Sequence, residues 1–196
     1  MIYFVGEPSR IRVPLSDDGV AAEARPSRGP REALSYEQLA EAIRRRNMMV
    51  WAPAGYGKSM MLTRKLIPLL RHIFPRNALW NTGMTGACAS LIGGVTMHGA
   101  MGIDHGAGSV EHLVERIKSR KKVLARWLGV RCIIIEECSM LSTELFEKLE
   151  AVARRIKQSE EFFGGIRIVF VGDFYQVSGG LVDYMADCFH VCLACR

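Results

Sequence analysis

Residues 48–59 have the sequence MMVWAPAGYGKS. The first four of them form a short apolar run, which is typical of a buried strand. A helix is expected from about Lys58 to His72, and the glycines before it favour a tight turn. The pattern therefore predicts a strand, a glycine-rich loop and a helix, in that order.

The loop in this stretch has the residue types of a phosphate-binding turn. Glycines let backbone amides curl around a phosphate, and the helix N-terminus adds positive potential. Lys58 would reach the β- and γ-phosphates, and Ser59 would ligate magnesium. The general pattern is Gly-x-x-x-x-Gly-Lys-Ser/Thr, although Ala52 stands at its first position. We therefore predict a site for ATP and Mg²⁺ with the loop residues Gly55, Tyr56, Gly57, Lys58 and Ser59.

A second half of such a site lies further along the chain. The apolar run Cys132–Ile135 ends in Glu136 and Glu137. We expect Glu136 to hold the magnesium shell and Glu137 to polarise the water that attacks the γ-phosphate. The usual residue at the first position is aspartate, and the extra methylene of glutamate moves the carboxylate by about 1.5 Å. Binding can survive this change while the rate of hydrolysis falls.

Short apolar runs alternate with helical patterns through the rest of the chain. Such alternation predicts an α/β fold, in which a mainly parallel sheet is covered by helices on both sides. A capping box at Ser35–Gln38 indicates one further helix start. The remaining expected strands are Ala78–Trp80 and Ile166–Val171, and the remaining expected helices are Ser109–Leu128 and Thr143–Gln158.

Composition limits the class of protein. The 196 residues are 49% hydrophobic and 23% charged, which excludes a disordered, collagen-like or coiled-coil chain. Residues 1–33 hold four of the seven prolines and are expected to form an extended leader. Residues 34–180 would form one lobe and residues 181–196 a tail. We find no signal peptide and no apolar run of the ~20 residues that a membrane span needs, so we expect an intracellular protein with free thiols.

Five segments, in order from Leu34 to Val177, resemble the motifs of PIF-type and RecD-like superfamily 1 helicases. The resemblance implies that the fold is a RecA-like P-loop NTPase, a three-layer αβα sandwich. The segments are LSYEQ at 34–38, TGMTGACA at 82–89, GVTMHG at 94–99, EECSML at 136–141 and GDFYQ at 172–176.

The resemblance also implies roles for residues beyond the phosphate loop. Gln38 would read the adenine edge, and Gln176 would sense the γ-phosphate and link it to DNA movement. Catalysis would involve Lys58, Glu136, Glu137 and Gln176. The path of a single DNA strand would be lined by Thr85, Gly86, Thr96 and His98.

The function implied by the resemblance is that of an ATP-dependent DNA helicase that unwinds in the 5′-to-3′ direction. Its partners would be single-stranded and forked DNA, and its processes telomere maintenance, recombination and repair, in the nucleus or the mitochondrion. We expect a monomer. The family also uses a second RecA-like lobe with an arginine finger, which we do not find in this sequence.

Two other functions remain open from the residues. Ala52, Tyr56 and Glu136 are compatible with a degenerate or fragmentary module that binds nucleotide or DNA without turnover. A small-molecule kinase would leave the segments at 94–99 and 172–176 without a role. The net charge of +6 favours polyanions only weakly. Cys188, Cys192 and Cys195 are more often incidental than a zinc site, and the cations of Lys118–Lys122 more often a solvated helix end than a DNA contact.

Overall fold

The computed structural model describes residues 36–45, 47–51, 57–104 and 106–173. Within them a five-stranded sheet has the order β1-β5-β4-β2-β3, and every neighbouring pair is parallel. The strands are β1 (Met48–Trp51), β2 (Leu79–Gly83), β3 (Val95–Thr96), β4 (Cys132–Glu136) and β5 (Arg167–Gly172). All strands therefore end at the same edge of the sheet.

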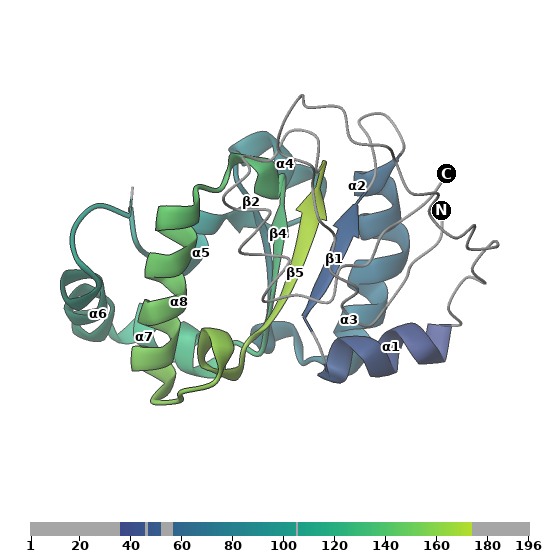
Figure 1. The fold of residues 1–196 in the computed structure, drawn as a ribbon. Helices are drawn as coiled ribbons and strands as arrows, with labels where there is room; N and C mark the ends of the chain where they lie inside the picture. The colour runs from purple at the N-terminus through teal and green to yellow at the C-terminus, as the bar shows by residue number, and fades with distance from the viewer. Residues whose placement is uncertain (1–35, 46, 52–56, 105, 174–196) are drawn as a thin grey trace, which may run out of the picture.

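Helices cover both faces of the sheet (Figure 1). One face carries α1 (Tyr36–Arg45) and a continuous helical segment made of α2 (Lys58–Met61), the π-helical η1 (Leu62–Leu66) and α3 (Ile67–Ile73). The other carries α5 (Met97–Met101), α6 (Val110–Ser119), α7 (Lys121–Gly129) and α8 (Thr143–Lys157). The short α4 (Gly86–Leu91) lies near the carboxyl ends of the strands (Figure 1). Single 3₁₀ turns occupy Arg76–Ala78, Cys138–Met140 and Phe162–Gly165.

The three layers follow from the alternation of side chains along each strand. Ile133 and Ile135 of β4 pack in one core with α8, whereas Cys132 and Ile134 pack in the other with α3. β4 is central and all five of its residues are buried. This explains its unbroken apolar run and confirms the expected αβα sandwich.

Most predicted elements are present, with shifted ends. The expected helix from Ser109 to Leu128 is two helices, because Arg120 adopts an extended conformation between them. The expected strand at Ala78–Trp80 begins one residue later and continues to Gly83. Thr82 is buried in this added part, and its hydroxyl donates to the carbonyl of Ile134 at 2.5 Å, so a polar residue fits the sheet.

Besides the single 3₁₀ turns, two helices and one strand were not predicted from the residues: α4, α5 and β3. Each is short, and together they hold the polar and glycine-rich segments at 82–89 and 94–99, which have no apolar period. The Trp127 indole, which is completely buried, donates to the Met101 carbonyl at 2.9 Å and fixes α5 against α7. The expected leader, the residues of the tail and Ser35 of the capping box lie outside the described residues. None of the described helices is long and apolar enough to cross a membrane.

Candidate nucleotide-binding site

The carboxyl ends of four strands meet at one level of the sheet. Glu136 of β4 pairs with Gly83 of β2 on one side and with Val171 of β5 on the other, and Trp51 of β1 pairs with Gly172. In open α/β sheets, ligands bind in the crevice beyond these ends. The predicted site residues that follow β1 and β4 are therefore brought to one edge.

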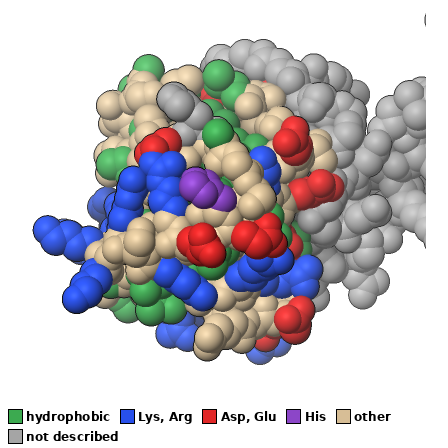
Figure 2. All heavy atoms as spheres, turned by 90° about the vertical axis from the view of Figure 1, so that its left-hand side faces the viewer, with side chains coloured by type: hydrophobic (Ala, Val, Ile, Leu, Met, Phe, Trp, Pro, Cys, Tyr) green, Lys and Arg blue, Asp and Glu red, His purple; other side chains and the backbone are tan. Residues whose placement is uncertain are grey.

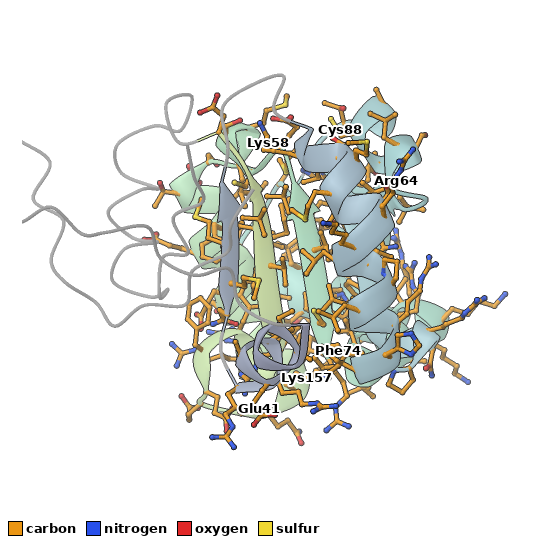
Figure 3. The ribbon with its side chains drawn as sticks, turned by 90° about the vertical axis from the view of Figure 1, so that its right-hand side faces the viewer. Glu41, Lys58, Arg64, Phe74, Cys88 and Lys157 are labelled. Atoms are coloured by element: carbon orange, nitrogen blue, oxygen red, sulfur yellow. The ribbon has the colours of Figure 1, made fainter. Side chains whose placement is uncertain are left out.

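The phosphate loop leads directly into α2. Gly57 has φ +76° and ψ 26°, a left-handed conformation that glycine adopts without strain. Lys58 is the first residue of the helix, and Figure 3 shows its side chain at the end of the molecule where the strands terminate. Gly55 and Tyr56, together with Ala52, lie outside the described residues.

Ser59 connects this loop to the acidic strand end. Its Oγ donates to Oε1 of Glu136 at 2.6 Å, across 77 positions of sequence. The bond joins the first turn of α2 to the last residue of β4. The two halves of the site predicted from separate segments are thus in direct contact.

Glu136 is an unusual carboxyl group. Only 3% of the residue is exposed, and its Oε2 is buried without a hydrogen-bond partner among the described residues. Burial raises the pKa of Glu136, and the charge of Glu137 raises it further, while the Ser59 hydrogen bond and the Lys58 charge lower it. A cation near Oε2 would favour the ionised form.

The turn after β4 places the second acid. Glu137 has φ +56°, which is uncommon for a residue with a side chain, and it starts the 3₁₀ turn Cys138–Met140. Cys138 is completely buried, and burial together with the Glu137 charge raises the pKa of its thiol to about 12. This thiol packs against the end of β5, where a Cβ added to Gly172 would lie 2.7 Å from its Sγ.

Asp173 lies at the same edge of the sheet, and our sequence analysis did not select it as a candidate site residue. It follows β5 directly, two residues beyond the register partner of Glu136, and it is 6% exposed. A carboxylate immediately after a buried parallel strand was the available signal. Gln176 was chosen from the same segment and lies outside the described residues.

The residues predicted to line a DNA path begin two short helices. Thr85 caps α4, accepting from the Cys88 amide at 3.2 Å and donating to Cys88 Sγ at 3.0 Å. Thr96 caps α5, accepting from the Gly99 amide at 3.2 Å. Gly86 is the first residue of α4 and is exposed, and His98 lies in α5 half-buried. Gln38 belongs to α1, but its side chain is outside the described part of the chain.

These features define a P-loop nucleotide-binding protein. A sequence model of the PIF1-like helicase family matches residues 35–181. The chain is 38% identical over 131 residues to ATP-dependent DNA helicase PIF1 of Saccharomyces cerevisiae (strain YJM789) and 37% identical over 171 residues to that of Xenopus laevis. The chain belongs to the PIF1-like helicase family, and the nucleotide use expected from its loop agrees with this membership.

Solved structures support the same assignment. The crystal structure of Pif1 helicase from Candida albicans aligns with a TM-score of 0.66 at 36% identity, over 74% of this chain and 33% of that chain. Bacteroides sp Pif1 in complex with ADP-AlF4 aligns at 0.54 over 78% of this chain and 35% of that one, and at 22% identity it supports the fold alone.

The chain is short beside its relatives. The alignments cover 67% of it and 15% of the Saccharomyces protein, and 83% of it and 26% of the Xenopus protein.

Proposed function

We propose that this chain is the ATP-binding lobe of an ATP-dependent DNA helicase. The observation that carries the proposal is the 2.6 Å hydrogen bond from Ser59 to Glu136, because it joins the phosphate loop to the acidic strand end. Such a pair is needed where a triphosphate and its metal are held together. Family membership supports the motor over a nucleotide-binding module without turnover.

Magnesium fits this donor set. Mg²⁺ prefers oxygen ligands and usually keeps several waters and substrate phosphates in its shell. The Ser59 hydroxyl and the Glu136 carboxylate are such ligands, and the unpaired Oε2 of Glu136 gains a partner. When bound, the metal neutralises charge on the β- and γ-phosphates.

The protein side chains divide the remaining work. Lys58 holds the phosphates at the start of α2, where the helix N-terminus also favours an anion. Glu137 orients and polarises the attacking water beside Glu136. Gln176 senses the γ-phosphate and Gln38 reads the adenine, as the family resemblance implies.

The DNA path crosses the same edge of the sheet through Thr85, Gly86, Thr96 and His98. The two threonine hydroxyls are already helix caps, so each accepts an amide proton. The Thr96 hydroxyl has no acceptor for its own proton in the described chain, and it suits a phosphate oxygen. Contacts of this kind go to the backbone and are independent of base sequence.

The biological role proposed here rests on the family. The reaction is the unwinding of DNA in the 5′-to-3′ direction, and the partners are single-stranded and forked DNA. The processes are telomere maintenance, recombination and repair. The protein would act as a monomer in the nucleus or the mitochondrion. Stepping along DNA requires a second RecA-like lobe, and the chain spans 15% of the Saccharomyces relative.

A DNA-stimulated ATPase assay tests the proposal. Phosphate release from Mg-ATP should rise on addition of single-stranded DNA and vanish in Lys58→Ala. A matched control is Lys65→Ala, because Lys65 is an exposed lysine of η1 in the same helical segment. Nucleotide binding without any turnover, with or without DNA and even when a second RecA-like lobe is supplied, would support the module that binds without hydrolysis instead.

A further inference from the structure

A cavity of about 330 Å³ lies at the outer edge of the sheet, and neither Lys58 nor Ser59 lines it. Three arginines from three elements line it: Arg71 of α3, Arg76 of the 3₁₀ turn after it, and Arg126 of α7. β3 pairs only with Thr82 and Gly83 of β2. The part of β2 before Thr82 pairs with β4 on its other side, and on the side of this cavity it has no neighbouring strand among the described residues.

The positive charge in this cavity is not compensated by the described residues. The side chains of Arg71, Arg76 and Arg126 make no hydrogen bond or ion pair within the ranges that the structure describes. Elsewhere, Arg155 donates to Glu111 at 2.5 Å, and Arg45 pairs with Glu41 at 2.6 Å. A guanidinium group presents a planar fork of donors that matches a phosphate, so the cavity is suited to a phosphate-bearing ligand.

A second polar group in the same wall is unsatisfied. Asn81 lines the cavity, and its Oδ1 is buried without a partner among the described residues. Its Nδ2 donates to the Ile92 carbonyl at 3.4 Å. An unpaired acceptor needs a donor, which an ionised phosphate lacks, whereas every nucleobase carries N–H groups. A nucleotide brings both a phosphate for the arginines and a base donor for Asn81.

The cavity adjoins the proposed DNA path. Val95 lines it and is 54% exposed, and the next residue is Thr96. Lys and Arg side chains also gather along one side of the face formed by α6 and α8 (Figure 2). The start of α7 and the residues just before it also carry exposed cations, namely Lys118, Arg120, Lys121 and Lys122. A strand leaving Thr96 around this edge would remain on a basic surface.

We propose that the cavity is a subsite for one nucleotide of a DNA strand, with the phosphate on Arg71, Arg76 and Arg126 and the base edge on Asn81. The inference rests on the proposed function, because it extends the strand path that starts at Thr96. The volume of the cavity is within the range of small-ligand pockets, roughly 300–1,000 Å³. The site would hold the strand without contributing to nucleotide hydrolysis.

The test compares two variants of equal charge in the full chain. Arg71→Gln/Arg126→Gln neutralises two walls of the cavity, and Arg45→Gln/Arg155→Gln removes the same charge from paired arginines elsewhere. Binding of fluorescent oligo(dT) is measured by anisotropy across a salt series. Weakening the grip on this one phosphate should lower the affinity about tenfold and reduce the salt slope by at most about 0.7, the value for one phosphate contact on a single strand. The control should keep its slope, and all proteins should bind Mg-ATP alike.

Asn81→Ala provides an independent readout. It removes an uncharged contact, so affinity for oligo(dT) should fall by roughly three- to tenfold with the salt slope of the wild type. Circular dichroism checks that the variant is folded, because the bond to Ile92 is also lost.

Three other results of these binding assays would decide against the proposal. If Arg71→Gln/Arg126→Gln binds oligo(dT) with wild-type affinity and slope, the subsite is wrong, while DNA-stimulated turnover of the wild type keeps the proposed function. Fluorescent poly-glutamate is the second probe. If Arg71→Gln/Arg126→Gln lost binding to poly-glutamate but not to oligo(dT), the cavity would be assigned to an acidic protein and the proposal would be overturned. If the wild type binds neither Mg-ATP nor DNA, both the inference and the proposed function fail.

Discussion

Ser59→Ala removes the contact that joins the two halves of the site. The Ser59 hydroxyl donates to a carboxylate oxygen of Glu136 at 2.6 Å, and the other oxygen of Glu136 has no partner among the described residues. In the variant, neither oxygen of this buried carboxyl group has a hydrogen-bond partner among the described residues. A hydrogen bond to a charged group contributes about 1.5–3 kcal/mol. At about 2–4 °C per kcal/mol for a chain of this size, we expect the Tm of the nucleotide-free protein to fall by roughly 3–12 °C.

The loss should depend on pH. Because burial raises the pKa of Glu136 above its usual value, the folded protein holds this proton to a higher pH than the unfolded chain does. The contribution of Glu136 to the free energy of unfolding therefore falls as pH rises from the unfolded pKa through the folded one. Ser59→Ala raises the pKa of Glu136 in the folded protein further, because the hydrogen bond that lowers it is lost. The pH range over which Glu136 reduces the free energy of unfolding therefore becomes wider. The difference between wild type and variant should be larger at about pH 8 than at about pH 5.

Urea denaturation at both pH values measures these differences, with Ser59→Thr as the control that keeps the hydroxyl. In a Glu136→Gln background the same substitution should cost only about 1 kcal/mol, because the bond is then between neutral groups. The resulting coupling free energy is about 1 kcal/mol. Equal losses at both pH values and in both backgrounds would show that Ser59 and Glu136 are not partners.

Three further predictions concern the surroundings of the site. Gly172→Ala should destabilise the fold by about 1–3 kcal/mol, since its Cβ would lie 2.7 Å from Cys138 Sγ; addition of Cys138→Ala should restore much of the loss in chemical denaturation, and no rescue would refute the close approach. Among the thiols of the described residues, Cys88 should react with iodoacetamide before Cys132 and Cys138, because burial raises the pKa of both of the latter; peptide mapping that finds the reverse order would contradict this burial. Thr96→Ala should lower Tm through a lost cap of about 1 kcal/mol and also weaken oligo(dT) binding, whereas Thr96→Ser should do neither; a loss of Tm without a loss of DNA affinity would leave Thr96 a cap alone.

Much of the fold could be predicted because its central strands are short, apolar and continuous. The runs that begin at Met48 and Cys132 became β1 and β4 with nearly the expected bounds. The long amphipathic helix α8 was equally clear, since its apolar face repeats at helical spacing. These elements depend on local patterns that the sequence displays directly.

The elements that were missed depend on contacts remote in sequence. β3 is two residues long and forms only because β2 lies beside it. The break at Arg120 divides a pattern that is apolar on both sides of it. Of the site, the types and order of Lys58, Ser59 and Glu136 were predictable, but the direct bond from Ser59 to Glu136 was not. A glutamate in place of the usual aspartate reaches further, and only the three-dimensional register determines where its carboxyl group ends.

The account depends on one pocket, in which Lys58 and Glu136 face the same magnesium-bound triphosphate. Titration of the purified chain with a fluorescent ATP analogue, with and without Mg²⁺, measures this most directly, alongside Lys58→Ala and the Lys65→Ala control. We expect magnesium to strengthen binding, Lys58→Ala to lose most of the binding while it remains folded, and Lys65→Ala to resemble the wild type. The account would be contradicted if the folded wild type did not bind the ATP analogue. It would also be contradicted if Lys58→Ala bound the analogue as tightly as the wild type and Mg²⁺ changed neither affinity.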